Sequence, residues 1–362
     1  MGEAPPARSG RRIAIVRFTS LGDVVHTLPV AAAVRRHEPT ARLIWLVEEH
    51  EQILLNGNPI VDDVLLVPLR RWREQLTRAS GFGAIRRELG ALRQRLRELR
   101  IDVAIDVQGW AHKTSPFVRM TGAPLRIGFD RRYARDPVST LFTTVRVTPP
   151  PGTKHVVDLN LTLLGPVGIS APGTAQFPLP LWPDAEARIA TWLRERAIRT
   201  PRLIALLPST RGPQKLWPAG SFTELGRRLL AGGDATLLLL GGPGEEARLD
   251  QVRGNLPADR TIVWAGGTVP ELTAILRRTD LVIGNDTGPL HLAAAHEVPS
   301  LGLFGPTRGE RNGPYGPSGA FIQSRTGKMA DIAVDEVEAR ARDLSRASSA
   351  ARAAQSRSRI RE

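Results

Sequence analysis

The sequence predicts an α/β protein of two doubly wound domains in series, each built around a mostly parallel sheet. Short apolar runs rich in branched side chains, typical of strands buried on both faces, alternate with longer segments of helical spacing. The alternation runs to about residue 109, weakens, and starts again at residue 202. Repeated strand–helix–strand units imply right-handed crossovers and a parallel sheet, and 362 residues suffice for two cores.

In the first half, four apolar runs predict strands and three segments predict helices. Apolar side chains in the segment GFGAIRRELGALRQRLRELR recur every three or four positions, as in an amphipathic helix. The strands are expected at 12–18, 42–49, 64–69 and 101–109, and the helices at 26–39, 81–100 and 156–168.

The second half repeats this pattern. Gly232 and Gly233 stop one helix, and Pro243 with two following glutamates opens the next beside its positive dipole end. The strands are expected at 202–208, 235–242, 261–267, 281–286 and 299–307, and the helices at 185–197, 219–233, 243–256, 269–280 and 287–298.

A proline-rich segment, PGTAQFPLPLWPD, separates the two series and predicts the hinge between the domains. We expect an N-terminal domain over 12–180 and a C-terminal domain over 181–345. Residues 1–11 are expected to form a loose leader, and residues 346–362 a basic, disordered tail.

The composition narrows the classes of function. The chain has no cysteine, which excludes a disulfide framework, a thiolate zinc site and a cysteine nucleophile. No apolar run reaches the roughly 18 residues of a membrane-spanning helix. The net charge is +14, and residues 70–100 contribute half of it through ten arginines and three acids. This balance favours an anionic partner, which is a nucleic acid, a membrane surface or a phosphorylated substrate.

The predicted site lies at strand-to-helix turns, because ligands of doubly wound sheets bind at the carboxyl ends of the strands. In RFTSLGDVVHTLP, Gly22 allows a tight turn and Asp23 stands at the start of a helix. Asp23 is either a carboxylate that caps the helix or a general base beside the crevice, and the two roles are compatible.

The matching turn of the second half is LVIGNDTGPLHLAAA. The backbone amides of Thr287 and Gly288 open a helix there, which suits a phosphate group. Asp286 would repel a phosphate, so we expect it to accept sugar hydroxyls. His291 lies on the first turns of the same helix, where a structural role is the commoner one.

Two further turns of the second half carry candidate ligands of a nucleotide. In LLPSTRGPQKLWP, Ser209 and Thr210 supply hydroxyls and Lys215 supplies a positive charge for a diphosphate; the alternative is a solvated loop. In GGPGEE, Glu245 or Glu246 holds ribose hydroxyls or simply begins a helix. That turn lacks the spacing of dinucleotide and P-loop motifs.

The basic stretch LRRWREQ follows a predicted strand directly. Its arginines, Arg70, Arg71 and Arg73, suit an anionic acceptor that takes paired hydrogen bonds, or they form an ordinary solvated surface. The sequence shows no HExxH or DxD pattern and no Ser-His-Asp arrangement. We therefore expect neither a metal site nor a cofactor.

Eight motifs, taken together and in this order, resemble glycosyltransferase family 9, the ADP-heptose:lipopolysaccharide heptosyltransferases. They are TSLGDVVHTLP, WLVEEH, LRRW, DVQG, RDPVSTLF, KHVVD, NDTGPLHLAAA and FGPT. The likeness extends over roughly residues 12 to 345. Within the family it is greatest to the heptosyltransferase I enzymes, which add the first heptose to the Kdo of the inner core.

The resemblance implies a GT-B fold, in which two Rossmann-like domains with parallel sheets face a central cleft. It also implies an inverting, metal-independent transfer without a cofactor, in which Asp23 is the general base. The N-terminal domain would bind the acceptor, and the C-terminal domain would bind the donor, ADP-L-glycero-D-manno-heptose. The implied donor-binding residues are Ser209, Thr210, Lys215, Glu246, Asp286, Thr287, Gly288 and His291.

The implied acceptor is Kdo–lipid A, whose carboxylates and phosphates match Arg70, Arg71, Arg73 and Arg135. The chain departs from the family after DVQG, where it continues WAHKTS instead of an apolar residue followed by KS. Either His112 or Lys113 is the acceptor-side candidate there. A lipid acceptor implies a cytoplasmic enzyme attached peripherally to the inner face of the cytoplasmic membrane, where arginines meet anionic headgroups.

Other interpretations stay open from the sequence. The nearest is a member of the same family with a later core acceptor, such as heptosyltransferase II, or with another nucleotide sugar. A nucleotide- or nucleic-acid-binding module would explain the charge, but aromatic residues make up only 5% and no nucleic-acid motif is present. We therefore expect no nucleic-acid partner, and the missing fingerprint disfavours an NAD-dependent enzyme.

Overall fold

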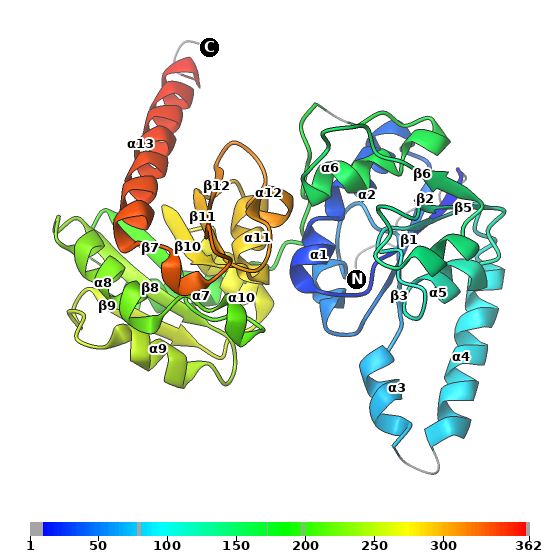
Figure 1. Ribbon diagram of the computed structural model, residues 1–362, viewed down its shortest axis with the longest axis horizontal. Coiled ribbons are helices and arrows are strands. Elements are labelled where there is room, and N and C mark those ends of the chain that lie inside the picture. Colours follow the sequence, from blue (N-terminus) through cyan, green and yellow to red (C-terminus); the bar gives the residue numbers. More distant parts are fainter. Residues whose placement is uncertain (1–9, 78–80, 172, 197, 199, 360–362) are drawn as a thin grey trace. The chain divides into compact units, whose positions relative to one another are not determined.

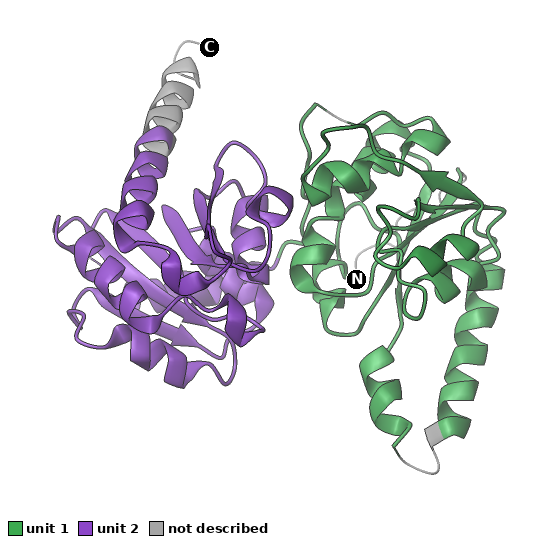
Figure 2. Cartoon of the chain, in the orientation of Figure 1, with its two compact units in different colours: residues 1–181 green, residues 182–362 purple. Residues whose placement is uncertain are grey.

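The computed structural model describes the backbone of residues 10–77, 81–171, 173–196, 198 and 200–359, and side chains up to residue 347. The chain divides into two compact units, residues 1–181 and 182–362 (Figures 1 and 2). The leader expected over residues 1–11 lies almost wholly outside the described residues.

The first unit contains a six-stranded sheet in which every pair of neighbouring strands is parallel. The strand order is β3-β2-β1-β4-β5-β6, the doubly wound order of a Rossmann fold. The strands are β1 (Arg12–Val16), β2 (Arg42–Val47), β3 (Asp63–Leu66), β4 (Val103–Asp106), β5 (Leu125–Phe129) and β6 (Val145–Val147). The helices are α1 (Leu21–Val25), α2 (Leu28–His37), α3 (Leu69–Gln75), α4 (Gly81–Glu98), α5 (Ser115–Met120) and α6 (Val156–Thr162), with 3₁₀ turns η1 (Glu51–Leu54), η2 (Pro137–Leu141) and η3 (Gly165–Val167).

The second unit repeats the same topology, because its order β12-β11-β10-β7-β8-β9 is the order of the first sheet read from the other side. The strands are β7 (Arg202–Leu207), β8 (Ala235–Gly241), β9 (Thr261–Ala265), β10 (Leu281–Asn285), β11 (Ser300–Phe304) and β12 (Gly319–Gln323). The helices are α7 (Pro183–Glu195), α8 (Ala219–Leu230), α9 (Glu246–Arg253), α10 (Val269–Leu276), α11 (Gly288–Ala295), α12 (Gly309–Asn312) and α13 (Val334–Arg359), with 3₁₀ turns η4 (Pro213–Lys215) and η5 (Met329–Asp331).

The predicted α/β class with two parallel sheets is confirmed. The sequence analysis missed the strands β5, β6 and β12, which lie at or next to a sheet edge. In β6 and β12, buried or half-buried residues alternate with exposed ones, so these strands are not the continuous apolar runs that mark central strands. The strand predicted over 64–69 was too long, since α3 already begins at Leu69.

The helix α13 enters the segment 346–362, for which the sequence predicts a disordered tail. The backbone there is helical up to Arg359, and the side chains from residue 348 onward lie outside the described ones. The disorder of the tail therefore stays a prediction.

Both sheets reverse their strand order at one point, between β1 and β4 in the first unit and between β7 and β10 in the second. In doubly wound sheets the loops that leave the carboxyl ends of two such strands diverge to opposite faces and leave a crevice. The turns after these four strands contain most of the residues that the sequence singled out.

The core of the second unit includes Leu237, on β8, which is fully buried. We expect Leu237→Ala to lower the free energy of unfolding of this unit by about 2–5 kcal/mol, because the removed carbons leave a cavity. Urea unfolding measures the change. Leu181→Ala makes the same change at the exposed end of the first unit and is the control, since Leu181 is 81% exposed and the substitution should alter stability by no more than about 0.5 kcal/mol. Equal effects of the two variants would contradict this account of the core.

Candidate active site

The crevice of the first unit joins the turn after β1 to the loop after β4. The ammonium of Lys113 donates a 2.7 Å hydrogen bond to the hydroxyl of Thr19. Asp106, the buried last residue of β4, accepts hydrogen bonds from the Gly109 amide at 2.8 Å and the Ser115 hydroxyl at 2.6 Å. These bonds fix the loop that carries Lys113 at the carboxyl edge of the sheet.

Asp23 is the third residue of α1 and has two sets of partners. One carboxylate oxygen accepts hydrogen bonds from the Ser20 amide at 2.8 Å and the Ser20 hydroxyl at 3.1 Å. The other oxygen forms an ion pair with the guanidinium of Arg17. The Arg17 side chain is 8% exposed, whereas that of Asp23 is 36% exposed. Asp23 therefore takes part in the helix cap and still presents part of its carboxylate to solvent.

Glu48, immediately after β2, links the acceptor-side candidates, and the sequence analysis did not select it. Its buried carboxylate accepts a 2.9 Å hydrogen bond from the Arg70 amide at the start of α3. The Lys113 ammonium lies 3.9 Å from its other oxygen. A charged residue at the end of an apolar run was the available signal, in the motif WLVEEH. Glu48 thus ties the helix of the arginines to the β4 loop.

The cations of the first unit differ in their surroundings. Arg71 pairs with Glu88 of α4 through hydrogen bonds of 3.2 and 3.1 Å, and Arg73 is exposed. The guanidinium of Arg135 lies over the ring of Trp110, 4.1 Å from its centroid. The Lys113 ammonium lies 5.3 Å from the same centroid. The structure therefore brings Lys113 and Arg135 together around one aromatic side chain.

The pKa of Lys113 is lowered, mainly because burial desolvates its ammonium. The carboxylates of Glu48 and Glu51 oppose this change, and the charges of Arg73 and Arg135 add to it. These influences show that the candidate cations share one electrostatic environment. An anion entering it would meet several positive groups at once.

The second unit gathers its candidates around Asp286, which follows β10. The Lys215 ammonium donates a 2.6 Å hydrogen bond to one carboxylate oxygen, and the Thr307 hydroxyl donates to the same oxygen at 2.9 Å. The ring nitrogen Nε2 of His291 lies 3.5 Å from the other oxygen. The Thr210 hydroxyl donates to the Asp286 carbonyl at 2.7 Å. The sequence did not indicate Thr307, although it lies in the motif FGPT.

Burial alone would raise the pKa of Asp286. The hydrogen bond and charge of His291, followed by those of Lys215, outweigh it and hold the pKa well below its ordinary value. The carboxylate is therefore ionised at neutral pH, and it fixes the Lys215 ammonium at the crevice.

The turn after β7 carries a buried hydroxyl with no partner. Ser209 is 8% exposed, and its oxygen has no hydrogen-bond partner among the described residues. The turn itself is held by Asn285, whose side chain accepts from the Trp217 amide at 3.0 Å and donates to the Pro208 carbonyl at 2.8 Å. A buried hydroxyl without a partner is costly, so the position suits a polar ligand.

Glu245 and Glu246 follow β8, one strand further along the sheet. Glu245 is occupied within its own turn, where it accepts a 2.7 Å hydrogen bond from the Gly242 amide. Glu246 is exposed, at the first position of α9, and accepts a 3.3 Å bond from the Gly244 amide. No hydrogen bond or ion pair of the described residues joins Glu246 to the Asp286 cluster.

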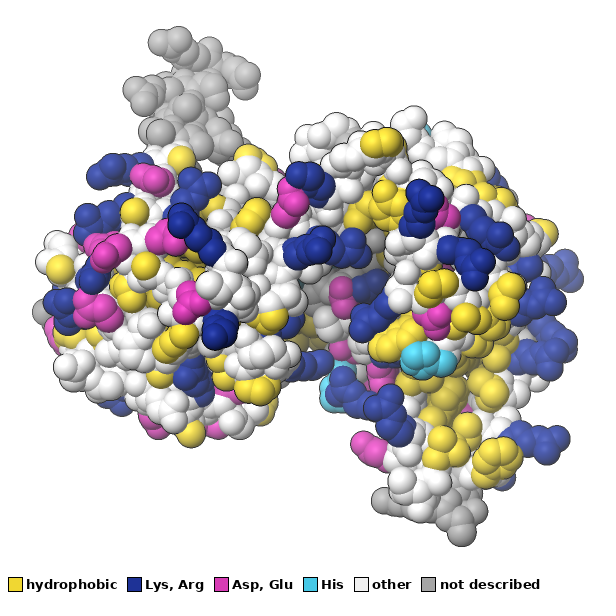
Figure 3. Space-filling view, in the orientation of Figure 1, with side chains coloured by type: hydrophobic (Ala, Val, Ile, Leu, Met, Phe, Trp, Pro, Cys, Tyr) yellow, Lys and Arg dark blue, Asp and Glu magenta, His cyan; other side chains and the backbone are white. Residues whose placement is uncertain are grey.

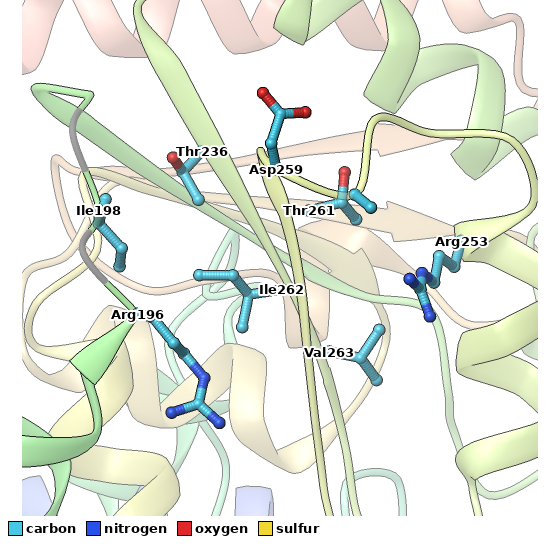
Figure 4. A pocket seen from close by; sticks show the side chains of 9 residues that line it. Arg196, Ile198, Thr236, Arg253, Asp259, Thr261, Ile262 and Val263 are labelled. Carbon is cyan, nitrogen blue, oxygen red and sulfur yellow. The ribbon is translucent and has the colours of Figure 1, made fainter. Parts of the chain in front are cut away.

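Among the described residues, no group of three or more acidic or histidine side chains forms a metal-binding cluster. The second unit also has a pocket of about 430 Å³, shown in Figure 4. Its lining includes Thr236 near the start of β8 and Thr261 at the start of β9. The pocket therefore lies at the amino ends of these strands and not at the candidate site.

The model of the family described as "Glycosyltransferase family 9 (heptosyltransferase)" matches residues 89–340. The chain belongs to glycosyltransferase family 9. The predicted family and the predicted enzyme class, a glycosyltransferase, are thereby confirmed.

Individual proteins that are similar to this chain are heptosyltransferases as well. The lipopolysaccharide heptosyltransferase 1 of Pseudomonas aeruginosa is 31% identical over 86% of this chain and 84% of its own length. The solved structure of the E. coli heptosyltransferase WaaC with ADP matches with a TM-score of 0.75, 25% identity and coverage of 92% of this chain and 99% of that one. The structure of WaaC with ADP-2-deoxy-2-fluoro heptose matches with a TM-score of 0.71, 25% identity and coverage of 90% and 98%. The two-sheet architecture is the GT-B fold of these enzymes.

The depressed pKa of Asp286 predicts a pH-dependent stability of this glycosyltransferase. Asp286→Asn should lower the free energy of unfolding at pH 7 by about 2–3 kcal/mol, the contribution of a strongly depressed carboxylate. Because the folded pKa lies below the unfolded value, this contribution is present above about pH 4 and is lost as the pH falls further. Urea unfolding between pH 3 and pH 7 measures the difference.

The exposed carboxylate of Asp250 on α9 supplies the control. Asp250→Asn should follow the wild-type curve over the whole pH range. A difference between wild type and Asp286→Asn that is the same at pH 3 and pH 7 would contradict the pairing of Asp286 with Lys215 and His291.

Proposed function

We propose that the enzyme transfers L-glycero-D-manno-heptose from ADP-heptose to Kdo–lipid A, with inversion and without a metal ion. The observation that carries the proposal is the cluster at the crevice of the second unit. There the Lys215 ammonium and the unpartnered Ser209 hydroxyl accompany Asp286 at the carboxyl ends of β7 and β10. This is the chemistry that a diphosphate requires, and a relative of the same fold is solved with an ADP-heptose analogue.

The donor side must stabilise negative charge on the departing diphosphate as the anomeric carbon–oxygen bond breaks. Lys215 supplies a fixed positive charge, and the amides of Thr287 and Gly288 at the start of α11 supply hydrogen-bond donors and the positive end of a helix dipole. The hydroxyls of Ser209 and Thr210 complete the diphosphate site in this proposal.

The remaining donor residues are assigned to the sugars. Asp286 and His291 adjoin the diphosphate site and are proposed to meet the heptose. Glu246 is proposed to accept hydrogen bonds from the ribose hydroxyls. Its exposed carboxylate supports this assignment over Glu245, which is occupied in its own turn.

Asp23 is proposed to be the general base that removes the proton from the acceptor hydroxyl. This task needs a carboxylate that the acceptor can reach, and the side chain of Asp23 is 36% exposed at the turn after β1. The bonds from Ser20 fix the direction of the carboxylate, so little ordering remains for the reaction.

The acceptor is proposed to bind the first unit through Arg70, Arg71, Arg73, Lys113 and Arg135. Guanidinium groups match carboxylates and phosphates in pairs of hydrogen bonds. Glu48 contacts both Lys113 and the backbone at the start of α3, so it keeps these two parts of the proposed acceptor site close together.

The two units accordingly carry different proposed roles, acceptor binding in the N-terminal domain and donor binding in the C-terminal one.

No helix within the described residues is long and apolar enough to cross a membrane. The enzyme is proposed to work in the cytoplasm, on the inner face of the cytoplasmic membrane, where its lipid acceptor lies.

The role of Asp23 predicts the effect of a single substitution. Asp23→Asn keeps an oxygen for the Ser20 amide but cannot accept the proton, so kcat should fall about 10²–10⁴-fold. Transfer from ADP-heptose to Kdo–lipid A, followed by mass spectrometry, measures this. Asp184→Asn changes another exposed first-turn acid, on α7, and should retain wild-type turnover. Wild-type turnover of a folded Asp23→Asn enzyme would end the assignment.

The donor assignment predicts selective stabilisation by adenine nucleotides. ADP at about 100 times its Kd should stabilise the enzyme by about 2.7 kcal/mol, whereas UDP at the same concentration should not. Lys215→Met should weaken ADP binding at least tenfold, because a charge-assisted hydrogen bond contributes about 1.5–3 kcal/mol. Thermal shift over an ADP titration measures both effects.

Lys328→Met provides the control for this titration, because Lys328 is an exposed lysine of the same unit. Its ADP response should equal that of the wild type. Equal stabilisation by ADP and UDP, or an unchanged ADP response in Lys215→Met, would refute the donor assignment.

A further inference from the structure

The helix α4 carries a basic stripe that the proposed sugar transfer does not use. Arg86, Arg93 and Arg97 are exposed and recur at intervals of seven and four residues, so they lie on one side of the helix. Phe82, four residues before Arg86, begins the same side and is 70% exposed. The three arginines form no ion pair or hydrogen bond with any described residue. We call these four residues the α4 stripe.

The orientation of α4 is fixed by the contacts of the neighbouring side of the helix with the core. Leu96 and Leu99 are buried in the core of the first unit, and Ile85, Leu89 and Leu92 pack against the same core. Since these residues hold one face of the helix inward, the α4 stripe remains on the outside.

The neighbouring helix α3 is attached to α4 and adds a second exposed apolar side chain. Glu88 of α4 accepts a 2.8 Å hydrogen bond from the indole of Trp72 and pairs with Arg71. Leu76, which directly follows α3, is 60% exposed. Figure 3 shows hydrophobic and basic side chains close together over this part of the first unit. Large exposed apolar side chains beside unpaired arginines distinguish an interaction surface from an ordinary solvated one.

We propose that the α4 stripe is a docking surface for an anionic lipid bilayer, with Phe82 entering the interface and the three arginines contacting headgroup phosphates. The apolar face of α4 packs inward, so the attraction comes from the exposed side chains: an aromatic ring can enter the headgroup boundary, and each arginine near an anionic surface strengthens binding about fivefold. The occupant is a bilayer because positive charge and an exposed aromatic side chain are both present on the stripe. This inference rests on the proposed function in that a lipid acceptor gives docking its purpose.

Flotation of the full chain with vesicles tests the proposal, without ADP-heptose or an acceptor. Wild type should bind vesicles of phosphatidylcholine with one quarter phosphatidylglycerol about 100-fold more tightly than vesicles of pure phosphatidylcholine, where only the apolar contribution of Phe82 remains. The triple variant Arg86→Gln/Arg93→Gln/Arg97→Gln should bind about 100-fold more weakly, the product of three fivefold losses. Phe82→Ser should bind roughly tenfold more weakly and should lose most of the binding that survives high salt.

The matched control removes the same charge from the second unit. Arg253, Arg325 and Arg340 are exposed, and their triple change to Gln should leave vesicle binding within twofold of the wild type. Equal losses in both triple variants would overturn the proposal in favour of unspecific attraction by net charge. An unchanged affinity of the α4 variants would overturn it as well.

Two further assays, of oligonucleotide binding and of sugar transfer, distinguish the docking surface from a nucleic-acid surface and from the proposed function. If the α4 triple variant loses binding to a fluorescent single-stranded oligonucleotide but keeps vesicle binding, the stripe is a nucleic-acid surface and the proposal fails. Sugar transfer to a detergent-dispersed acceptor tests the proposed function alone. Transfer with no stripe-dependent vesicle binding would refute the docking surface, and stripe-dependent binding without transfer would refute the proposed function.

Discussion

The crevice of each unit depends on one constraint, the common direction of the parallel strands. Every strand of a parallel sheet ends at the same edge, and the reversal of strand order separates the loops at one point of that edge. In this chain the reversal lies between β1 and β4 and between β7 and β10. Thr19 contacts Lys113, and Lys215 contacts Asp286, although the two residues of each pair are distant in sequence. They meet because their turns follow neighbouring strands that end at the same edge of the sheet.

The charged side chains are arranged differently in the crevices of the two units. Around Asp286, a nearly buried carboxylate pairs with the Lys215 ammonium and lies 3.5 Å from Nε2 of His291, so its desolvation is offset locally. In the first unit, the carboxylate of Glu48 lies near the side chains of Arg70 and Lys113, and Arg135 shares the ring of Trp110 with Lys113. In the proposed function, Lys215 and the amides at the start of α11 meet the diphosphate of the donor, and the arginines and Lys113 of the first unit meet the phosphates and carboxylates of the acceptor.

The sequence predicted the architecture well because central parallel strands are buried on both faces, and burial leaves a continuous apolar signal. It failed for β6 and β12, where exposed positions interrupt that signal. Asp23, Lys215 and Asp286 were identifiable as charges at strand-to-helix turns. Thr307 was not, because its importance comes from a partner that is remote in sequence, and no local pattern records such a contact. Glu48 left only the signal of a charged residue at the end of an apolar run, and its partners Arg70 and Lys113 are also remote.

The identical strand order of the two units has a consequence for how such enzymes can diversify. Each unit has its own complete sheet and its own core, and the division after Leu181 cuts no strand or helix. Recombination at that boundary exchanges a whole half and leaves the sheet of the other half complete. If the proposed roles hold, hybrids of two family members joined there would inherit their acceptor preference from one parent and their nucleotide preference from the other.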